Sequence, residues 1–428
     1  MNVVMLTNTY LPHVGGVARS VSTYEAELRR RGHDVRVVAP QFEGALDSSD
    51  LVLRTPAVQK FNGSDFSLTL PQPGLVAEFL DRAQPEILHS HHPFLLGDTA
   101  LRAAWTRRLP VVFTHHTLYE QYTHYVPLDS EALQRVTVEM VTQYANLCTH
   151  VIAPSQSIAD LIAKRGVTTP ISVLPTGIDL DQFGSGDGAA FRRRHGIAAE
   201  APVVGHVGRL AGEKNLAFLA RAAGLFLAER PDAVLVVVGS GDQQQAIQQI
   251  VSELADPGRL ILTGNLSGSE LFDAYAAMDL FVFSSQSETQ GMVLVEAMAA
   301  KSPVLALDGP GVRDVLSVAN GRLLAGDATT EEFAAAIDDL TRDRAALAQL
   351  GESARRSIQD YSLSACAERL LNLYERLSQE FVDRGPADWD PWDRLLRRIE
   401  IEWNLLVEKT SSLRAAIVDT EATIAELD

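Results

Sequence analysis

The stretch of sequence that decides the fold spans residues 280–303 and reads LFVFSSQSETQGMVLVEAMAAKSP. Its first four residues are an apolar run that predicts a buried strand, and the pattern after Gly291 predicts a helix that ends before Pro303. Glu288 therefore lies on a loop at the carboxyl end of a strand, and Glu296 lies inside the following helix. A strand, a loop and a helix in this order are typical of an α/β protein.

This loop and helix suit a ligand that carries both phosphate and hydroxyl groups. The backbone N–H groups of Gly291, Met292 and Val293 open the predicted helix, where N–H groups have no partner inside the helix and attract phosphate. Glu288 and Glu296 can accept hydrogen bonds from neighbouring sugar hydroxyls, since carboxylates are strong acceptors. The stretch predicts a sugar-nucleotide site; the alternative is an ordinary helix start with two unrelated acids.

Short apolar runs alternate with helical patterns along the whole chain, which predicts βαβ units on parallel sheets. The expected strands are 3–7, 35–39, 87–89, 111–114, 151–153 and 171–174 in the first half, and 203–207, 233–238, 260–262, 280–283, 304–307 and 321–324 in the second.

We therefore expect two doubly wound, Rossmann-like domains that face each other across a cleft. The first spans residues 1–183 and the second spans 184–383, and the final helix near 362–383 either stays with the second domain or crosses back to the first. A Gly-, Asp- and Ala-rich segment, residues 184–190, is interpreted as the linker between them. In open α/β sheets, ligands bind beyond the carboxyl ends of the strands.

The composition excludes several classes of protein. The 428 residues carry a formal net charge of −18, which argues against nucleic acid as a partner. Two cysteines, Cys148 and Cys366, fit a reducing compartment. The N-terminus reads as a strand rather than a signal peptide, and no apolar run approaches the ~20 residues of a membrane span. We expect a cytoplasmic protein.

Residues 384–428 follow a different pattern from the rest of the chain. Apolar residues that include Trp392 and Trp403 recur at alternating steps of four and three, which predicts an appended helix. We expect residues 390–428 to form one long helix that makes a homo-oligomer contact or docks on another protein. Two alternatives stay open: the arginines at 394, 397 and 398 could place the helix at a membrane interface, or the helix could pack back on the chain.

Other motifs follow other predicted strands. Gly15 and Gly16 allow close approach of a ligand to the start of the first helix. Arg209 and Lys214, after the strand 203–207, would place two cations where a departing nucleoside diphosphate gains negative charge. The turns at Gly239 and around Leu266 end the next two strands.

Taken together, these motifs resemble those of retaining GT-B glycosyltransferases of family 4, over nearly all of the chain up to about residue 383. The matching elements are E-x7-E at Glu288 and Glu296, G-R-x-x-x-x-K-N from residue 208, and V-G-x-G from residue 238. The resemblance implies that Glu288 binds the donor sugar and that Glu296 binds the ribose. Its other implied donor-binding positions are Arg209, Lys214, Gly15, Gly16, Gly239, Leu266, Thr289, Gln290, Gly291, Met292 and Val293.

The resemblance also implies a catalytic role for a histidine. His116 matches a family histidine beside the donor sugar, whereas His89, His91, His92 and His115 are interpreted as structural or acceptor-shaping residues. Clustered histidines also suggest a metal, but no Cys or carboxylate accompanies them at ligand spacing. The resemblance implies no cofactor, no metal requirement and a front-face substitution in which the leaving phosphate accepts the acceptor's proton.

The region from His115 to Tyr125 is rich in aromatic residues and looks like the subgroup that glucosylates diacylglycerol. This resemblance implies UDP-glucose as donor, a lipid acceptor, and peripheral contact with the inner face of the membrane. Tyr119, Tyr122 and Tyr125 could equally be ordinary helix packing. Alternative functions are the same chemistry on a soluble acceptor (an inositol phosphate, a sugar or a polysaccharide precursor) and a non-catalytic sugar-nucleotide-binding assembly subunit.

Overall fold

The computed structural model describes the chain except for residues 14, 46–47, 59–67, 71, 122–129 and 384–428. The chain divides into two compact units, Met1–Gly177 with the chain from Ser364, and Ile178–Leu363. The first boundary lies six residues before the predicted one at 183/184, and the second assigns most of the helix near 362–383 to the first unit. The heptad-patterned extension lies outside the described residues, so its oligomer contact stays a prediction.

Unit 1 is built on a seven-stranded parallel sheet with the order β3-β2-β1-β6-β7-β8-β9. Its six predicted strands are confirmed; β3 and the small antiparallel pair β4-β5 were not predicted. The strands are β1 (Asn2–Leu6), β2 (Asp34–Pro40), β3 (Val52–Thr55), β4 (Ala57–Val58), β5 (Leu68–Thr69), β6 (Ile87–Ser90), β7 (Val111–Thr114), β8 (His150–Ala153) and β9 (Ile171–Val173).

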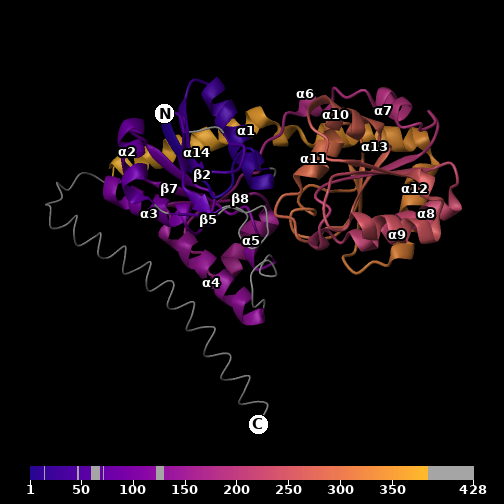
Figure 1. Cartoon of the computed structure of the whole chain (residues 1–428), viewed down its shortest axis with the longest axis horizontal. Coiled ribbons are helices and arrows are strands. Elements are labelled where there is room, and N and C mark those ends of the chain that lie inside the picture. Colours follow the sequence, from indigo (N-terminus) through magenta and orange to yellow (C-terminus); the bar gives the residue numbers. More distant parts are fainter. Residues whose placement is uncertain (14, 46–47, 59–67, 71, 122–129, 384–428) are drawn as a thin grey trace, which may run out of the picture. The chain divides into compact units, whose positions relative to one another are not determined.

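Helices cover both faces of this sheet, which is why central strands such as β6 and β7 are buried along their whole length rather than at alternate residues. One face packs α1 and α14 against residues such as Val3 and Met5, and the other packs α2 to α5 against residues such as Val4 and Leu6 (Figure 1). The helices are α1 (Gly16–Arg30), α2 (Pro73–Ala83), α3 (Leu96–Arg107), α4 (Glu131–Leu147), α5 (Gln156–Lys164) and α14 (Leu363–Asp383).

Unit 2 is built on a six-stranded parallel sheet with the order β12-β11-β10-β13-β14-β15. All six predicted strands are present. They are β10 (Val203–Val207), β11 (Val234–Val238), β12 (Leu260–Gly264), β13 (Leu280–Phe283), β14 (Val304–Leu307) and β15 (Gly321–Leu324). The strand order reverses between β10 and β13, so the loops that follow these two strands border the topological switch point, where α/β sheets bind ligands.

Two layers of helices enclose the unit 2 sheet. The buried side chains of α10 and α11 belong to one core, and those of α8, α9 and α12 belong to the other (Figure 1). The helix α13 contributes to both, with Ala354 in the first core and Leu347 in the second. The helices are α6 (Leu180–Phe183), α7 (Gly188–Arg194), η3 (Gly212–Lys214), α8 (Leu216–Glu229), α9 (Gln244–Leu254), η4 (Pro257–Arg259), α10 (Gly268–Ala277), α11 (Met292–Ala299), α12 (Thr330–Arg342), α13 (Arg344–Ser357) and η5 (Gln359–Tyr361).

The interpretation of residues 184–190 as a linker is wrong. Asp187 caps α7 by accepting a hydrogen bond from the Ala190 N–H at 2.8 Å. A Cβ on Gly186 would lie 2.1 Å from the Phe272 carbonyl oxygen, and one on Gly188 would meet α10 as closely. The glycines therefore allow this segment to pack directly on α10, and the composition reflects close packing rather than flexibility.

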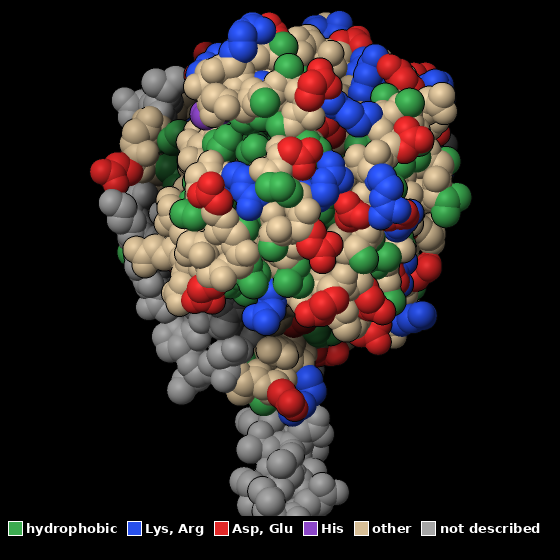
Figure 2. Space-filling model, turned by 90° about the vertical axis from the view of Figure 1, so that its right-hand side faces the viewer, with side chains coloured by type: hydrophobic (Ala, Val, Ile, Leu, Met, Phe, Trp, Pro, Cys, Tyr) green, Lys and Arg blue, Asp and Glu red, His purple; other side chains and the backbone are tan. Residues whose placement is uncertain are grey.

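The described surface of unit 2 mixes charges of both signs. Figure 2 shows basic and acidic side chains interspersed over the face that it draws. Arg342 and Arg322 on this unit pair with Asp338 and Asp339 at 2.6 and 2.7 Å, for example. Such exposed pairs contribute little stability. Among the described residues, no helix is both long and apolar enough to cross a bilayer.

Candidate active site

Hydrogen bonds connect the two loops at the switch point of unit 2. After β10, the chain turns through η3; after β13, it continues from Ser284 to α11. The Ser284 hydroxyl donates to the Lys214 carbonyl at 3.1 Å, and the Ser287 hydroxyl donates to the Glu213 carbonyl at 3.2 Å. These bonds hold the loop that carries Lys214 against the loop that carries Glu288.

Lys214 and Glu288 form an ion pair at the centre of these loops. The Lys214 Nζ lies 2.6 Å from the Glu288 Oε1, and only 16% and 17% of the two side chains are exposed. Burial favours the neutral carboxyl, but the Lys214 ammonium outweighs this effect and holds the pKa of Glu288 below its usual value. The structure thus brings together a cation and a carboxylate that the sequence assigned to phosphate and sugar.

Arg209 has a carboxylate partner that the sequence analysis did not single out. The Arg209 guanidinium, half exposed, donates to the Glu213 Oε1 at 2.5 Å, whereas the Glu213 side chain is only 6% exposed. Because Glu213 is buried, it limits the directions that the longer Arg209 side chain can take. The spacing of four residues on a turn was the available signal for this pair.

Gly291 occupies the position that begins α11. Its φ of 69° is left-handed, which favours glycine. The Leu294 N–H donates to the Gly291 carbonyl at 2.9 Å, so the N–H groups of Met292 and Val293 precede the first bond of the helix. Thr289 and Gln290 lie in the same loop, immediately before Gly291.

The Glu296 side chain is buried in unit 2 rather than exposed to solvent. It is 1% exposed, and its Oε2 accepts a hydrogen bond from the Tyr275 hydroxyl on α10 at 2.7 Å. Tyr275 is itself fully buried, and its ring lies 5.9 Å from that of Phe281 in β13 in a tilted arrangement. This phenol orients the carboxylate, and the sequence carried no local signal for it because Tyr275 is distant in the chain.

Backbone contacts connect the carboxyl ends of β10, β11 and β12. The Gly208 N–H donates to the Val238 carbonyl at 3.0 Å, and the Gly239 N–H donates to the Gly264 carbonyl at 2.8 Å. Leu266 follows two residues later, half-buried against the apolar core. The predicted donor-binding positions Gly239 and Leu266 thus lie on adjacent turns at one edge of the sheet.

Gly15 and Gly16 lie in unit 1 at the start of α1. Gly15 precedes the helix with extended backbone, and α1 begins at Gly16. A Cβ on Gly16 would meet no atom within 4 Å, whereas one on Gly15 would lie 3.2 Å from the His13 ring. There is open space beside Gly16 at the start of α1, whereas the His13 ring lies close to Gly15.

The histidines in and directly after β6 are buried. His89 bonds to the Tyr374 hydroxyl at 2.6 Å and to the Thr114 hydroxyl at 2.7 Å, and the His92 Nδ1 accepts from the Asn8 N–H at 3.0 Å. Burial lowers the pKa of His89 and of His92 to about 3. Both rings are neutral at neutral pH, and their bonds tie β6 to α14 and to the loop after β1.

His116 is paired with His91. The His91 Nδ1 and the His116 Nε2 are 2.9 Å apart, with ring centroids 5.2 Å apart and stacked. Burial lowers the pKa of each ring well below its usual value, so one neutral ring donates and the other accepts.

Tyr119 packs edge-on against Phe94 at 5.1 Å, in agreement with the packing alternative for this tyrosine. Tyr122 and Tyr125 lie outside the described residues.

Mild acid is expected to destabilise the protein through these histidines. Burial lowers the pKa of His89 to about 3 and that of His115 to about 4, against ~6.5 in an unfolded chain. Between these values the unfolded chain binds more protons, so stability falls as pH drops, by about 1.4 kcal/mol per pH unit for each histidine. Urea unfolding at pH 5.0, 5.5, 6.0 and 8.0 measures the slope. His89→Gln should reduce it by one histidine's share; an unchanged slope would contradict this account.

Within the described residues, no three His, Cys, Asp or Glu side chains are arranged to hold a metal ion. Asp179 and Asp181 resemble a D-x-D metal motif but have other partners. The Asp179 Oδ1 caps α6 by accepting from the Gln182 N–H at 3.0 Å, and the Asp181 Oδ1 pairs with the Arg355 guanidinium at 3.2 Å.

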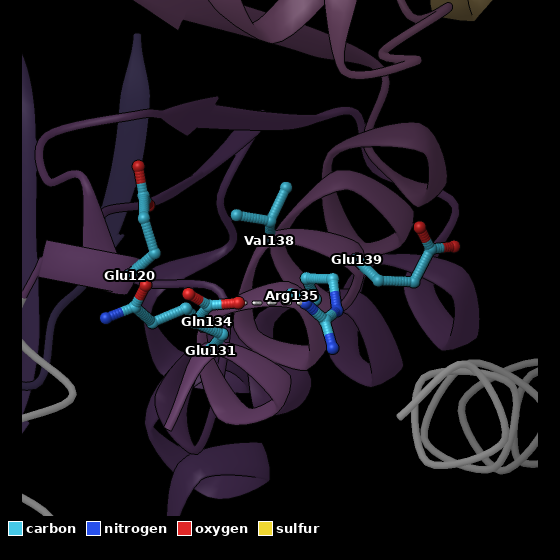
Figure 3. Close-up of a pocket in the computed structure, with 6 residues that line it drawn as sticks. All are labelled: Glu120, Glu131, Gln134, Arg135, Val138 and Glu139. Atoms are coloured by element: carbon cyan, nitrogen blue, oxygen red, sulfur yellow. Dashed lines mark ion pairs between the residues drawn. The ribbon is translucent and has the colours of Figure 1, made fainter. Parts of the chain in front are cut away.

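A separate hollow of about 440 Å³ lies on unit 1 beside α4. Figure 3 shows side chains of both charges and of neutral type around it, with Arg135 and Glu131 paired at 3.7 Å. It has three glutamates, so its lining does not suit a diphosphate. Its lining residues are Glu120, Glu131, Gln134, Arg135, Val138 and Glu139.

The sequence and the fold both match known proteins. The model described as Glycosyltransferase Family 4 matches residues 14–182, and the one described as Glycosyl transferases group 1 matches residues 187–357. The chain is 29% identical to an alpha-monoglucosyldiacylglycerol synthase of Streptococcus pneumoniae (74% of this chain, 73% of the relative). It is 28% identical to a GDP-mannose-dependent alpha-mannosyltransferase of Corynebacterium glutamicum (87% and 88%).

A third relative and a solved structure complete the comparison. The chain is 30% identical to a D-inositol 3-phosphate glycosyltransferase of Nocardia farcinica (69% of this chain, 67% of the relative). The crystal structure of Anabaena HepE in complex with UDP superposes with a TM-score of 0.70 at 20% identity, over 88% of this chain and all of that one.

The two doubly wound units and the two family matches together show a glycosyltransferase of the GT-B fold that uses a nucleotide sugar. The chain belongs to glycosyltransferase family 4 and is a retaining hexosyltransferase.

Proposed function

We propose that this protein transfers glucose from UDP-glucose to a lipid acceptor such as diacylglycerol. The observation that carries the proposal is the pair of Lys214 and Glu288, two partly buried, oppositely charged groups at the switch point of unit 2. A phosphate attracts the ammonium and sugar hydroxyls donate to the carboxylate, so one donor molecule can satisfy both. A non-catalytic binder would have less need of two such charges held side by side.

Each part of the donor then has its own residues. Arg209, Lys214 and the N–H groups of Gly291, Met292 and Val293 hold the diphosphate. Glu288 binds the transferred sugar. The ribose and the base are assigned to Glu296 and to the turns at Gly239 and Leu266. Thr289 and Gln290 belong to the loop that binds the sugar. Gly15 and Gly16 are proposed as further diphosphate-binding positions.

The proposed reaction is a substitution on one face of the sugar. The bond between C1 and the diphosphate oxygen breaks, and the acceptor hydroxyl oxygen bonds to C1 on the same face. The hydroxyl proton passes to the departing phosphate oxygen. Arg209 and Lys214 stabilise the negative charge that develops there, a role that needs no metal ion, and His116 borders the reacting sugar.

The acceptor is proposed from two observations. The Streptococcus pneumoniae relative is, by its name, a glucolipid synthase. In unit 1, Tyr119 follows β7 and packs between Phe94 and His115, at ring-centroid distances of 5.1 and 6.4 Å, which gives this region an aromatic character. A lipid acceptor requires peripheral contact with a membrane surface. The Nocardia farcinica relative favours a second candidate, transfer to an inositol phosphate in solution.

Product analysis distinguishes these functions. The full chain is incubated with labelled UDP-glucose or GDP-mannose, and with either diacylglycerol vesicles or inositol 3-phosphate. We expect an α-linked glucolipid from UDP-glucose and vesicles only, formed about two to three orders of magnitude more slowly by the Glu288→Ala variant. A water-soluble product alone would favour the second candidate. Failure of both donors to react or hydrolyse would contradict the proposed function.

A further inference from the structure

His206 occupies the point where the central strands of unit 2 separate. β10 and β13 pair in parallel at Val204 with Leu280 and at Gly205 with Phe281. One residue further, the His206 Nδ1 lies 3.1 Å from the Val282 carbonyl oxygen. The imidazole therefore bonds to the neighbouring strand at the switch point, where the site loops begin.

This hydrogen bond defines the tautomer of His206. A carbonyl oxygen can only accept, so the Nδ1 carries the proton and donates it. Burial lowers the pKa of His206 to about 4, so the ring is neutral at neutral pH. The Nε2 is then an acceptor only, and this buried atom has no hydrogen-bond partner among the described residues. An acceptor left unsatisfied in the protein interior is costly.

The Nε2 points toward the turn that carries the site cations. The ring stacks with Phe281 and Phe283, at centroid distances of 6.1 and 5.9 Å. A Cβ built on Gly208 would lie 3.4 Å from the Nε2, so this atom is adjacent to the Gly208 turn. The charges of Lys214 and Glu288 both act on the His206 ring.

We propose that His206 is a positioning residue for Lys214, whose ammonium donates to the His206 Nε2 when a nucleotide sugar occupies the site. An ammonium has three donors, and Glu288 takes one of them in this structure. Sugar hydroxyls compete for Glu288, and the phosphate takes another donor. A neutral acceptor holds the ammonium in place and leaves its positive charge available to the phosphate. A second carboxylate would instead neutralise that charge. The inference rests on the proposed role of Lys214 in donor binding.

Two substitutions at His206 test the roles of the two ring nitrogens separately. His206→Asn retains a donor near the Nδ1 position and loses the Nε2 acceptor, whereas His206→Gln retains an acceptor near the Nε2 position and loses the bond to Val282. Calorimetry measures the affinity of UDP, and of GDP, for the wild-type protein, both variants, Lys214→Ala and the His206→Asn/Lys214→Ala double variant. Thermal unfolding of each variant is the control.

We expect His206→Asn to weaken binding about tenfold with little change in thermal midpoint, as for the loss of one hydrogen bond to a charged group. His206→Gln should retain most of the affinity and lower the midpoint. In the Lys214→Ala background, His206→Asn should have no further effect.

Two results would overturn the inference. If His206→Asn weakens binding by the same factor with and without Lys214, the imidazole bonds directly to a ligand hydroxyl or acts through the fold. If it leaves wild-type affinity unchanged, the Nε2 has no role in binding. Failure of the proposed function gives a different result. In that case the wild-type protein binds neither UDP nor GDP, or Lys214→Ala binds as tightly as the wild-type protein. Either result would also overturn this inference.

Discussion

Lys214→Ala and Glu288→Ala are each expected to lower kcat by about two to three orders of magnitude while the protein stays folded. The loss of one preorganised charge that acts on the transition state costs about 3–4 kcal/mol, and each 1.36 kcal/mol is tenfold in rate. The two side chains meet at 2.6 Å and are mostly buried, so their charges act in surroundings with little solvent screening. Initial rates at saturating donor, with circular dichroism of each variant, measure the effect.

The chain offers a matched control for this prediction. Lys301 and Glu352 also lie in unit 2 and pair at 2.7 Å, but their side chains are 54% and 51% exposed. Lys301→Ala and Glu352→Ala remove the same chemical groups, and we expect kcat to change by less than about twofold, since exposed pairs contribute little. Near wild-type turnover in Lys214→Ala or Glu288→Ala would contradict the assignment of the site.

The stability of the two single variants provides a second readout. Removal of one partner leaves the other charge partly buried, which is more destabilising than removal of both. The double variant Lys214→Ala/Glu288→Ala should therefore unfold at a higher urea concentration than the sum of the single effects predicts. The exposed pair of Lys301 and Glu352 should show additive effects.

The strands were predictable because each is a short apolar run between turns. The runs 111–114 and 280–283 are buried along their whole length, as strands covered on both faces must be. β3 was missed because its apolar run is only three residues long, from Leu51 to Leu53, and lies between the charged residues Asp50 and Arg54 at the edge of the sheet. The packing of α14 with unit 1 depends on a surface formed by residues such as Val3 and Tyr24, more than 300 positions away in the chain.

The residues of the candidate site were predictable only where they stand close together in the sequence. Glu288 and Gly291 stand in one loop, and their order relative to the strand is legible in the sequence. Glu213 and His206 were missed because their importance depends on burial and on partners that the fold supplies. Composition also misled at 184–190, since glycines that permit close helix packing and glycines in a flexible linker look the same in a sequence.

Gly239→Ala is expected to have the second large effect, a loss of about 4 kcal/mol in the stability of unit 2. Gly239 has a φ of 135°, a conformation that residues with a Cβ rarely adopt, and a Cβ there would lie 1.9 Å from the Gly208 carbonyl oxygen. Backbone strain of about 1–3 kcal/mol and overpacking of a similar size both apply. The clash is with backbone that precedes Arg209, so it must displace the turn that carries the site cations.

Other glycines of unit 2 separate the two causes. Gly264 has a φ of 72° but would meet no atom within 4 Å, so Gly264→Ala should cost only about 1 kcal/mol of strain. Gly212 has neither a positive φ nor a close neighbour, so Gly212→Ala should stay within about 0.5 kcal/mol of wild type. Thermal unfolding should order the variants Gly212, Gly264, Gly239, with the last about 10 °C below wild type. If Gly239→Ala were as stable as Gly212→Ala, the close contact of Gly239 with Gly208 would not be what requires glycine at this turn.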